Sequence, residues 1–286
     1  MVLSRDGVWV TASRGLATEL IAHPGFDPMT TGSPYAPCNV VPLDEDIVHA
    51  APHPTARLIV PVTRVVESLA GEVDLISGFA ARICAEALAE TFDVPLPWLA
   101  ERIAITSAAV DAALCPQQLA VTRRMLGALD DLRDRLSDPG AVLLTVVGAQ
   151  LATTLLGNTL DMLLEGSSRA PWVVDQPLSL QPPVHLHALT ARTGLDFGGA
   201  RVAAGDQVVV LVGAVNGDGA CAPLLLGPPY AAVFPFARMV TETALSVLVK
   251  RFPRLRRTGP ALRRRRAPVT RALLRLPAST DVRDEA

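Results

Sequence analysis

The chain has 286 residues, of which 50% are hydrophobic and 19% are charged, with a formal net charge of −2. This composition excludes an intrinsically disordered chain, and the length favours one domain with a large core over two loosely joined domains. The four cysteines (Cys38, Cys84, Cys115 and Cys221) form no CxxC pair, which argues against a zinc site and a secreted disulfide scaffold. Residues 1–6 show no apolar core of a signal peptide, so we expect a cytoplasmic protein.

Hydrophobic periodicity predicts a mostly helical fold with a small sheet towards the C-terminus. Short alternating or apolar runs predict strands at residues 8–11, 184–190 and 207–212. Helical spacing predicts helices at residues 12–23, 55–69, 76–92, 116–136, 141–164 and 236–251. Residues 26–52 are rich in Pro, Gly, Asp and Asn and are expected to form a long loop. Pro116 suits a first helical position, and Pro253 ends the last helix.

Glycines mark further turns in the predicted sheet region. Gly198, Gly199 and Gly205 lie between the strands expected at residues 184–190 and 207–212. We therefore expect turns at these three positions.

Residues 141–164 are long and apolar enough to resemble a membrane span. Gln150, Asn158 and Asp161 interrupt the segment, however. Hydrocarbon penalises a central carboxylate by about 2.5 to 3.5 kcal/mol, whereas a protein core can satisfy it. We therefore predict a buried core helix and no membrane partner.

Residues 250–275 contain basic residues and no acids, including four consecutive arginines at positions 263–266. Three interpretations remain open: a solvated strand edge, a surface for an acidic protein partner, and a nucleic-acid surface. No aromatic residue interleaves with the arginines, so a base-stacking platform is missing. We expect no nucleic-acid partner.

Several stretches carry a pattern that can be compared with known families. They are the His53 and Arg57 pair, the segment 148–158 within the core helix, the Gln176 and Ser179 positions before Pro182 and Pro183, the segment 202–216, and the segment 227–238 before the last helix. In their order and spacing these stretches resemble cytochrome P450 landmarks, from Val8 to about Pro277. The resemblance implies a truncated P450-like fold, mainly α with a small β component, over residues 1–286, with a disordered tail at 278–286.

At the positions that matter for P450 chemistry, the sequence departs from this family. Ala231 matches the haem-ligating cysteine, and a methyl group cannot ligate iron. Gln150 and Leu151 match a carboxylate and a hydroxyl that deliver protons, and neither can relay one. Gln176 and Ser179 match a buried Glu and Arg pair, and Pro177 disfavours a regular helix there. Nothing places Cys221, ten positions before Ala231, at the ligand site.

One branch of the family lacks the haem ligand and activates glycosyltransferases in macrolide and anthracycline pathways. Residues 115–122 and 263–271 are similar to segments of that branch. The resemblance implies a haem-free, non-catalytic auxiliary protein that forms a heterodimer with a nucleotide-sugar transferase. It also implies that the family's first helix is missing and that the loop before the ligand segment is reduced to residues 217–226.

The alternative is an enzyme: a haem-free P450 scaffold that cyclises or otherwise tailors a polyketide. It needs convergent polar groups, and His185 and His187 are the paired candidates because alternate residues of a strand share a face. Two ordinary strand histidines explain the same pattern. We therefore expect no catalytic, cofactor-binding or metal-ligating residues.

Overall fold

The computed structural model describes residues 1–4, 7–28, 58–112, 114–166, 174–217, 227 and 230–281. The helices are α1 (Arg14–Ala22), α3 (Ile59–Glu67), α4 (Ala81–Phe92), α5 (Leu96–Thr106), α6 (Ala109–Ala112), α7 (Leu119–Leu136), α8 (Pro139–Leu143), α9 (Ala149–Leu164), α10 (Asp175–Leu180), α11 (Val212–Gly217) and α12 (Tyr230–Arg251), with π-helical segments η1 (Leu75–Ala80) and η2 (Leu144–Gly148). The strands are β1 (Val2–Leu3), β2 (Trp9–Thr11), β3 (Phe26–Pro28), β4 (Glu72–Asp74), β5 (Leu186–Ala191), β6 (Leu195–Phe197), β7 (Ala200–Val202), β8 (Gln207–Leu211), β9 (Arg256–Arg257), β10 (Leu262–Arg263), β11 (Leu273–Arg275) and β12 (Pro277–Ser279).

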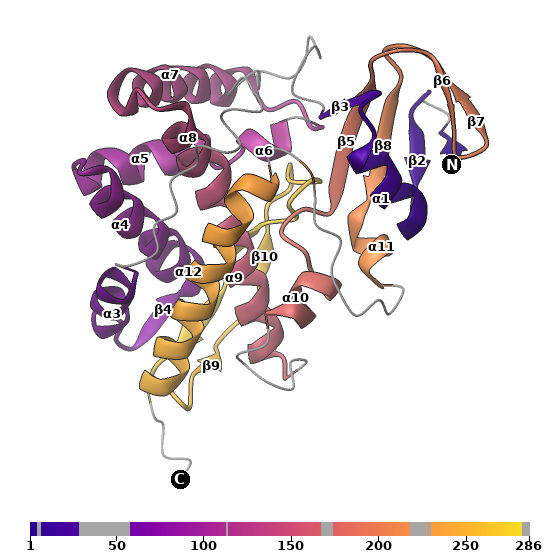
Figure 1. Cartoon of the computed structure of the whole chain (residues 1–286). Coiled ribbons are helices and arrows are strands. Elements are labelled where there is room, and N and C mark those ends of the chain that lie inside the picture. The colour runs from indigo at the N-terminus through magenta and orange to yellow at the C-terminus, as the bar shows by residue number, and fades with distance from the viewer. Residues whose placement is uncertain are drawn as a thin grey trace.

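A five-stranded sheet lies at one side of a larger helical body (Figure 1). Its order is β1-β2-β8-β5-β3, with β2 and β8 parallel and the other neighbours antiparallel. Val208 and Val210 alternate along β8 towards the buried side, where they join Ala17 and Leu20 of α1 in a small apolar core. The helical body surrounds a second and larger core.

The centre of the larger core is one continuous helix formed by α8, η2 and α9. Asp138 caps its start by accepting hydrogen bonds from the N–H groups of Gly140 and Ala141. This helix spans Pro139–Leu164, and 94% of its most apolar 18-residue window is buried, which confirms the predicted core helix. By length and composition α12 could also span a membrane, but it packs along α9, and 44% of its apolar window is buried.

Two glycines show what lies on either side of α9. A Cβ atom at Gly148 would meet Phe236 of α12, and one at Gly157 would meet Ile76 of η1 and Leu273 of β11. The two glycines are nine residues apart, or two and a half helical turns, so they face opposite directions. The central helix therefore has α12 on one side, and η1 and the C-terminal strands on the other.

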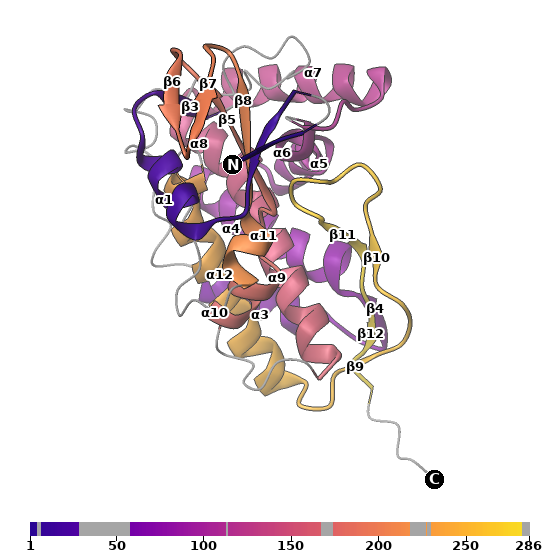
Figure 2. The ribbon, with the colours of Figure 1, turned by 90° about the vertical axis from the view of Figure 1, so that its right-hand side faces the viewer.

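The C-terminal strands form the outer layer on that second side (Figure 2). β4, β12 and β9 make a three-stranded sheet, and β10 pairs with β11 in a hairpin. Asp74 joins this layer to the helices, since it caps η1 and also accepts a 2.9 Å hydrogen bond from the N–H of Leu276. Although burial raises the pKa of Asp74, the hydrogen bonds from Leu276 and its other donors hold that pKa below its ordinary value.

Several predicted elements are confirmed. β2, β5 and β8 occupy the expected strand segments, and η1 continues into α4 as the helix expected at residues 76–92. Gly198, Gly199 and Gly205 have positive φ angles of 58°, 76° and 85°, as turn glycines do. The N-terminal part of the helix predicted at 55–69 and most of the predicted loop at 26–52 lie outside the described residues.

Other predictions are wrong. Phe26–Pro28 is a strand, β3, because the edge of β5 is available to pair with it. Pro116 does not begin α7, whose N-cap is Gln118. Pro177 lies within the first turn of α10, where an N–H has no intrahelical acceptor, so proline is tolerated. The tail predicted from residue 278 is wrong at residues 278 and 279, which belong to β12.

Candidate functional site

From Tyr230 onward, the segment that matches the haem-ligand loop is helical. α12 begins at Tyr230, and the N–H groups of Tyr230 and Ala231 donate to the carbonyl of Gly227 at 3.1 and 3.3 Å. Ala231 is exposed, whereas the ring of Tyr230 meets His187 edge-on with 5.3 Å between centroids. The segment therefore presents a solvent-facing methyl group where a thiolate is needed, and the predicted start of the last helix at residue 236 is corrected to 230.

The described cysteines do not replace that thiolate. Cys84 is fully buried in α4, and burial raises the pKa of its thiol to about 12, so it stays protonated. Its sulfur accepts a hydrogen bond from Thr153 of α9 at 3.5 Å. Cys115 is half-buried before α7, and Cys38 and Cys221 lie outside the described residues.

Metal ligands are likewise not gathered in the part of the chain that the structure describes. No group of three His, Cys, Asp or Glu side chains there could hold a metal ion. The described residues around Ala231 therefore do not fit a thiolate-held haem. His53 and Arg57, which match the propionate contacts, lie outside the described residues.

Gln150, at the proton-relay position, is part of a buried structural network. Its amide donates to the carboxylate of Asp111 at 3.1 Å and accepts from the N–H of Val110 at 3.3 Å. Leu151 is fully buried. Gln150 therefore joins α9 to α6.

Asp111, which the sequence analysis missed, is the centre of that network. Its carboxylate accepts hydrogen bonds from the N–H groups of Val269 and Thr270 at 2.9 and 2.8 Å, and from the hydroxyl of Thr270 at 2.6 Å. Burial raises the pKa of Asp111, and these hydrogen bonds and the charge of Arg264 oppose that rise. The sequence feature that could have identified Asp111 is a single acid within an otherwise apolar stretch.

The arginine run divides into two inward and two outward residues. Arg263 reaches Asp161 at 3.4 Å, Gln181 at 2.7 Å and Asn158 at 3.3 Å. Arg264 donates to the carbonyl and hydroxyl of Ser107. The interpretation of the whole run as a solvated edge is therefore wrong for residues 263 and 264. Residues 265 and 266 are exposed.

Asp161, on α9, is another buried acid. It pairs with Arg263 and, at 3.2 Å, with Arg257. Burial and the charge of Glu165 raise the pKa of Asp161 above its ordinary value, although the charges of the two arginines oppose this rise. This cluster fixes α9 to the C-terminal strands.

Gln176 and Ser179 lie on α10 and do not reproduce a buried ion pair. The hydroxyl of Ser179 donates to the carbonyl of Asp175 at 3.0 Å. The side chain of Asp175 instead pairs with Arg238 of α12 at 3.1 Å, where both side chains are about half exposed. α10 is thus held to α12 by a surface contact.

The two histidines of the enzyme alternative are not arranged as an acid–base pair. His187 is buried against Tyr230, while His185 lies near the charges of Arg263 and Arg271. Burial lowers the pKa of His187 to about 4, and burial with those charges lowers that of His185 to about 4. The Nε2 atom of each is buried without a hydrogen-bond partner among the described residues. No carboxylate there orients either ring.

Curated relatives match nearly the whole chain. Protein AknT of Streptomyces galilaeus is 31% identical over 97% of this chain and 84% of its own length. Protein DesVIII of Streptomyces venezuelae is 32% identical over 97% of this chain and 82% of its own length. Protein TylM3 of Streptomyces fradiae is 30% identical over 96% of this chain and 74% of its own length. The AknT alignment spans 375 positions, more than the 286 residues of this chain, because the relative carries segments that this chain lacks.

Solved structures show the same fold at lower identity. P450BioI, solved with an acyl carrier protein that bears hexadec-9Z-enoic acid, superposes with a TM-score of 0.80 at 17% identity, over 96% of this chain and 93% of that one. A mutant of P450 EryK in complex with erythromycin B superposes with a TM-score of 0.75 at 18% identity, over 100% of this chain and 94% of that one. No family model matches the sequence. On its fold and on its identity to AknT, DesVIII and TylM3, the chain belongs to the family of cytochrome P450-like auxiliary proteins.

Proposed function

We propose that this chain is a non-catalytic auxiliary protein that binds a nucleotide-sugar-dependent glycosyltransferase and stabilises its active form. The reaction it supports is transfer of a deoxysugar or aminosugar to a polyketide antibiotic. The observation that carries the proposal is Ala231, an exposed methyl group at the haem-ligand position of a chain that keeps the P450 fold. Identities of 30–32% to AknT, DesVIII and TylM3 support the same role.

The polar groups of the central helix support a scaffold in preference to a catalyst. Gln150 is hydrogen-bonded to Asp111, and Asp161 is paired with Arg263. These interactions join α9 to other parts of the fold, which is the structural role we assign to those groups. A scaffold that keeps its packing but not its chemistry is suited to binding, because fold and function are separable.

Activation of this kind needs no reactive group in the auxiliary protein. A protein that binds only the competent form of a transferase raises the population of that form. A differential binding energy of about 3 kcal/mol changes the population ratio by more than a hundredfold. The expected complex is a heterodimer, and its formation is what the activity depends on.

Co-expression tests the proposal. A candidate glycosyltransferase is produced with and without this chain, separated by size exclusion, and assayed with its sugar nucleotide and aglycone. We expect co-elution and higher transferase activity in the presence of the chain, and no such effect from a thiolate-ligated P450 used as a control of the same fold. A transferase that is equally soluble and equally active alone contradicts the proposal.

A titration separates activation from catalysis by the chain itself. An auxiliary subunit saturates the activity near one equivalent per transferase, whereas an enzyme continues to act well below one equivalent. The tailoring-enzyme alternative further requires that the purified chain convert a polyketide with no transferase present. Omission of the transferase is therefore the decisive control.

A further inference from the structure

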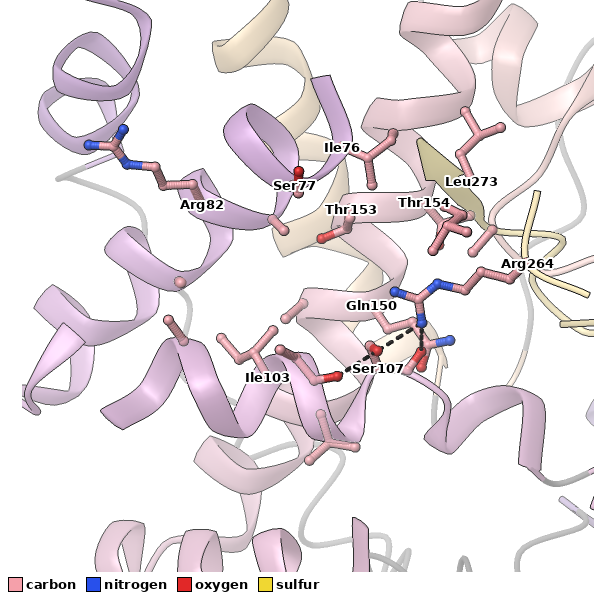
Figure 3. Close-up of a pocket in the computed structure, with 18 of the residues that line it drawn as sticks. Ile76, Ser77, Arg82, Ile103, Ser107, Gln150, Thr153, Thr154, Arg264 and Leu273 are labelled. Atoms are coloured by element: carbon pink, nitrogen blue, oxygen red, sulfur yellow. Dashed lines mark hydrogen bonds between the residues drawn. The ribbon is translucent and has the colours of Figure 1, made fainter. Parts of the chain in front are cut away.

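A cavity of about 490 Å³ lies on the side of α9 that is turned away from α12. Its walls come from α9, α5, the η1–α4 segment and the C-terminal hairpin (Figure 3). Ile76 and Leu273 line it, and these are the same residues that face Gly157 on the second side of α9. The cavity is therefore separate from the segment that contains Ala231, which begins α12 on the first side.

Most of the wall is apolar. Ile103 of α5 and Val146 of η2 line the cavity, and the small side chains of Ala85, Ala100 and Ala104 leave it open. A volume of this size is within the range of sites that hold small organic ligands. The body of a ligand that fits here must be hydrocarbon-rich, because few polar groups are available to it.

Among the described residues, the charged groups of the wall are two arginines, and no carboxylate lines the cavity. The guanidinium of Arg82 is held by Glu86 at 2.9 Å and by Ser68 at 2.8 Å. Arg264 instead extends from the hairpin into the space between α9 and α5, close to Ser107 and Gln150 (Figure 3). One of the two positive charges is thus already matched by an acid, and the other is turned towards the cavity.

Arg264 has incomplete polar partners. Its Nη1 donates to the carbonyl and hydroxyl of Ser107 at 3.1 and 2.8 Å, and its Nε is buried with no acceptor among the described residues. Asp111 attracts it, but no ion pair is formed, and both carboxylate oxygens of Asp111 already accept other hydrogen bonds. A cation removed from water without a paired anion is costly, and an anionic ligand relieves that cost.

We propose that this cavity binds a small apolar carboxylate, with its carboxylate on the guanidinium of Arg264 and its hydrocarbon body between α5 and α4. The pairing follows from the chemistry of the wall, which combines an arginine that forms no ion pair within the described part of the chain with mostly apolar side chains. The site is independent of the proposed role with a glycosyltransferase, since ligand binding is measured on this chain alone.

Calorimetric titration of the full chain with three probes tests the site. Decanoate carries both the charge and the chain, decanol only the chain, and acetate only the charge. We expect decanoate to bind at least about tenfold more tightly than either of the others, as a charge-assisted hydrogen bond in a partly buried site provides. Equal affinity for decanol and decanoate overturns the assignment.

Variants locate the binding within the fold. Arg264→Gln is expected to reduce decanoate affinity by about tenfold or more, while Arg265→Gln, the same charge change at an exposed neighbour, keeps it within about twofold. Ala104, which lines the cavity, is exposed, so Ala104→Phe places a ring at the cavity's open edge and leaves Arg264 in place. It is therefore also expected to reduce affinity, whereas Ala120→Phe on the exposed side of α7 is not. If circular dichroism shows that Arg264→Gln is misfolded, the comparison of Ala104→Phe with Ala120→Phe tests the site instead. Equal affinities in that pair overturn the site.

Discussion

The amide of Gln150 donates a hydrogen bond to the buried carboxylate of Asp111, 3.1 Å away, and this contact joins the central helix to α6. The same carboxylate accepts the N–H groups of Val269 and Thr270 from the C-terminal hairpin. Three parts of the chain that are far apart in sequence thus meet at one side chain. The position that matches a catalytic proton relay in P450s therefore has an architectural role here.

Asp111→Ala is expected to lower the free energy of unfolding by about 3 to 5 kcal/mol, because it leaves buried backbone and hydroxyl donors without an acceptor. Urea unfolding followed by circular dichroism measures the change. Asp134→Ala, an exposed acid of α7, is the matched control and should stay within about 0.5 kcal/mol of the unmodified chain. Similar effects of the two substitutions would show that the network adds nothing to stability.

Arg263→Ala and Arg265→Ala distinguish the inward from the outward arginines of the run. The first removes the contacts to Asp161, Gln181 and Asn158 and leaves a buried carboxylate with one fewer cation, so we expect a loss of about 2 to 4 kcal/mol. The second changes an exposed side chain and should cost less than about 0.5 kcal/mol. Thermal and urea unfolding of both variants provide the comparison, and equal losses would contradict the inward orientation of Arg263.

Stability is expected to fall below neutral pH because of His187. Burial lowers the pKa of His187 from 6.5 to about 4, so the unfolded chain takes up a proton near pH 6.5 that the folded chain refuses until about pH 4. The contribution of His187 to the free energy of unfolding is therefore fully present above pH 6.5. It declines as the pH falls, by about 2 kcal/mol at pH 5.

His187→Phe should remove that part of the pH dependence, since phenylalanine keeps the ring packing against Tyr230 but does not titrate. Unfolding free energies at pH 7.5 and pH 5 measure it. His185, whose pKa is also lowered to about 4, remains in the variant and contributes in the same direction. A variant with the full pH dependence of the unmodified chain would mean that His187 is not the group responsible.

Ala231→Cys is expected to give a protein without bound haem. The residue lies exposed in the first turn of α12, and α12 packs directly along the central helix α9. The absorbance spectrum of the variant, produced with a haem precursor and treated with dithionite and carbon monoxide, should stay flat in the Soret region. A thiolate-ligated P450 prepared in parallel is the positive control, and a thiolate–haem band in the variant would show that the sulfur was the one missing part.

The sequence pattern was sufficient to predict the helices and strands whose hydrophobic periodicity is strong. The core helix at residues 141–164 is long, apolar and interrupted by few polar groups, and the strand at residues 207–212 has a continuous apolar run, so both were predicted. α5 was missed because Pro95 and Pro97 lie at its start and hide a helix of only 11 residues. β3 was missed because a three-residue edge strand depends on its neighbour, β5, and not on its own composition.

The candidate site was predicted less completely. The departure at Ala231 was visible because one residue type at one position decides the chemistry. Asp111 was not visible, because its partners at residues 269 and 270 are 158 and 159 positions away and backbone N–H groups carry no sequence signal. The inward direction of Arg263 and Arg264 likewise depends on the path of the hairpin, which spacing alone does not determine.

The long sequence distance between Asp111 and the hairpin has a consequence for how the protein is made. During synthesis, α6 and α9 leave the ribosome before Arg263 and Thr270 do, so Asp111 and Asp161 lack their partners from the hairpin in that interval. A buried carboxylate without its donors is costly, so water is expected to hydrate these two side chains until the hairpin arrives. These contacts between the helices and the hairpin therefore form only after residues 263–270 have been made.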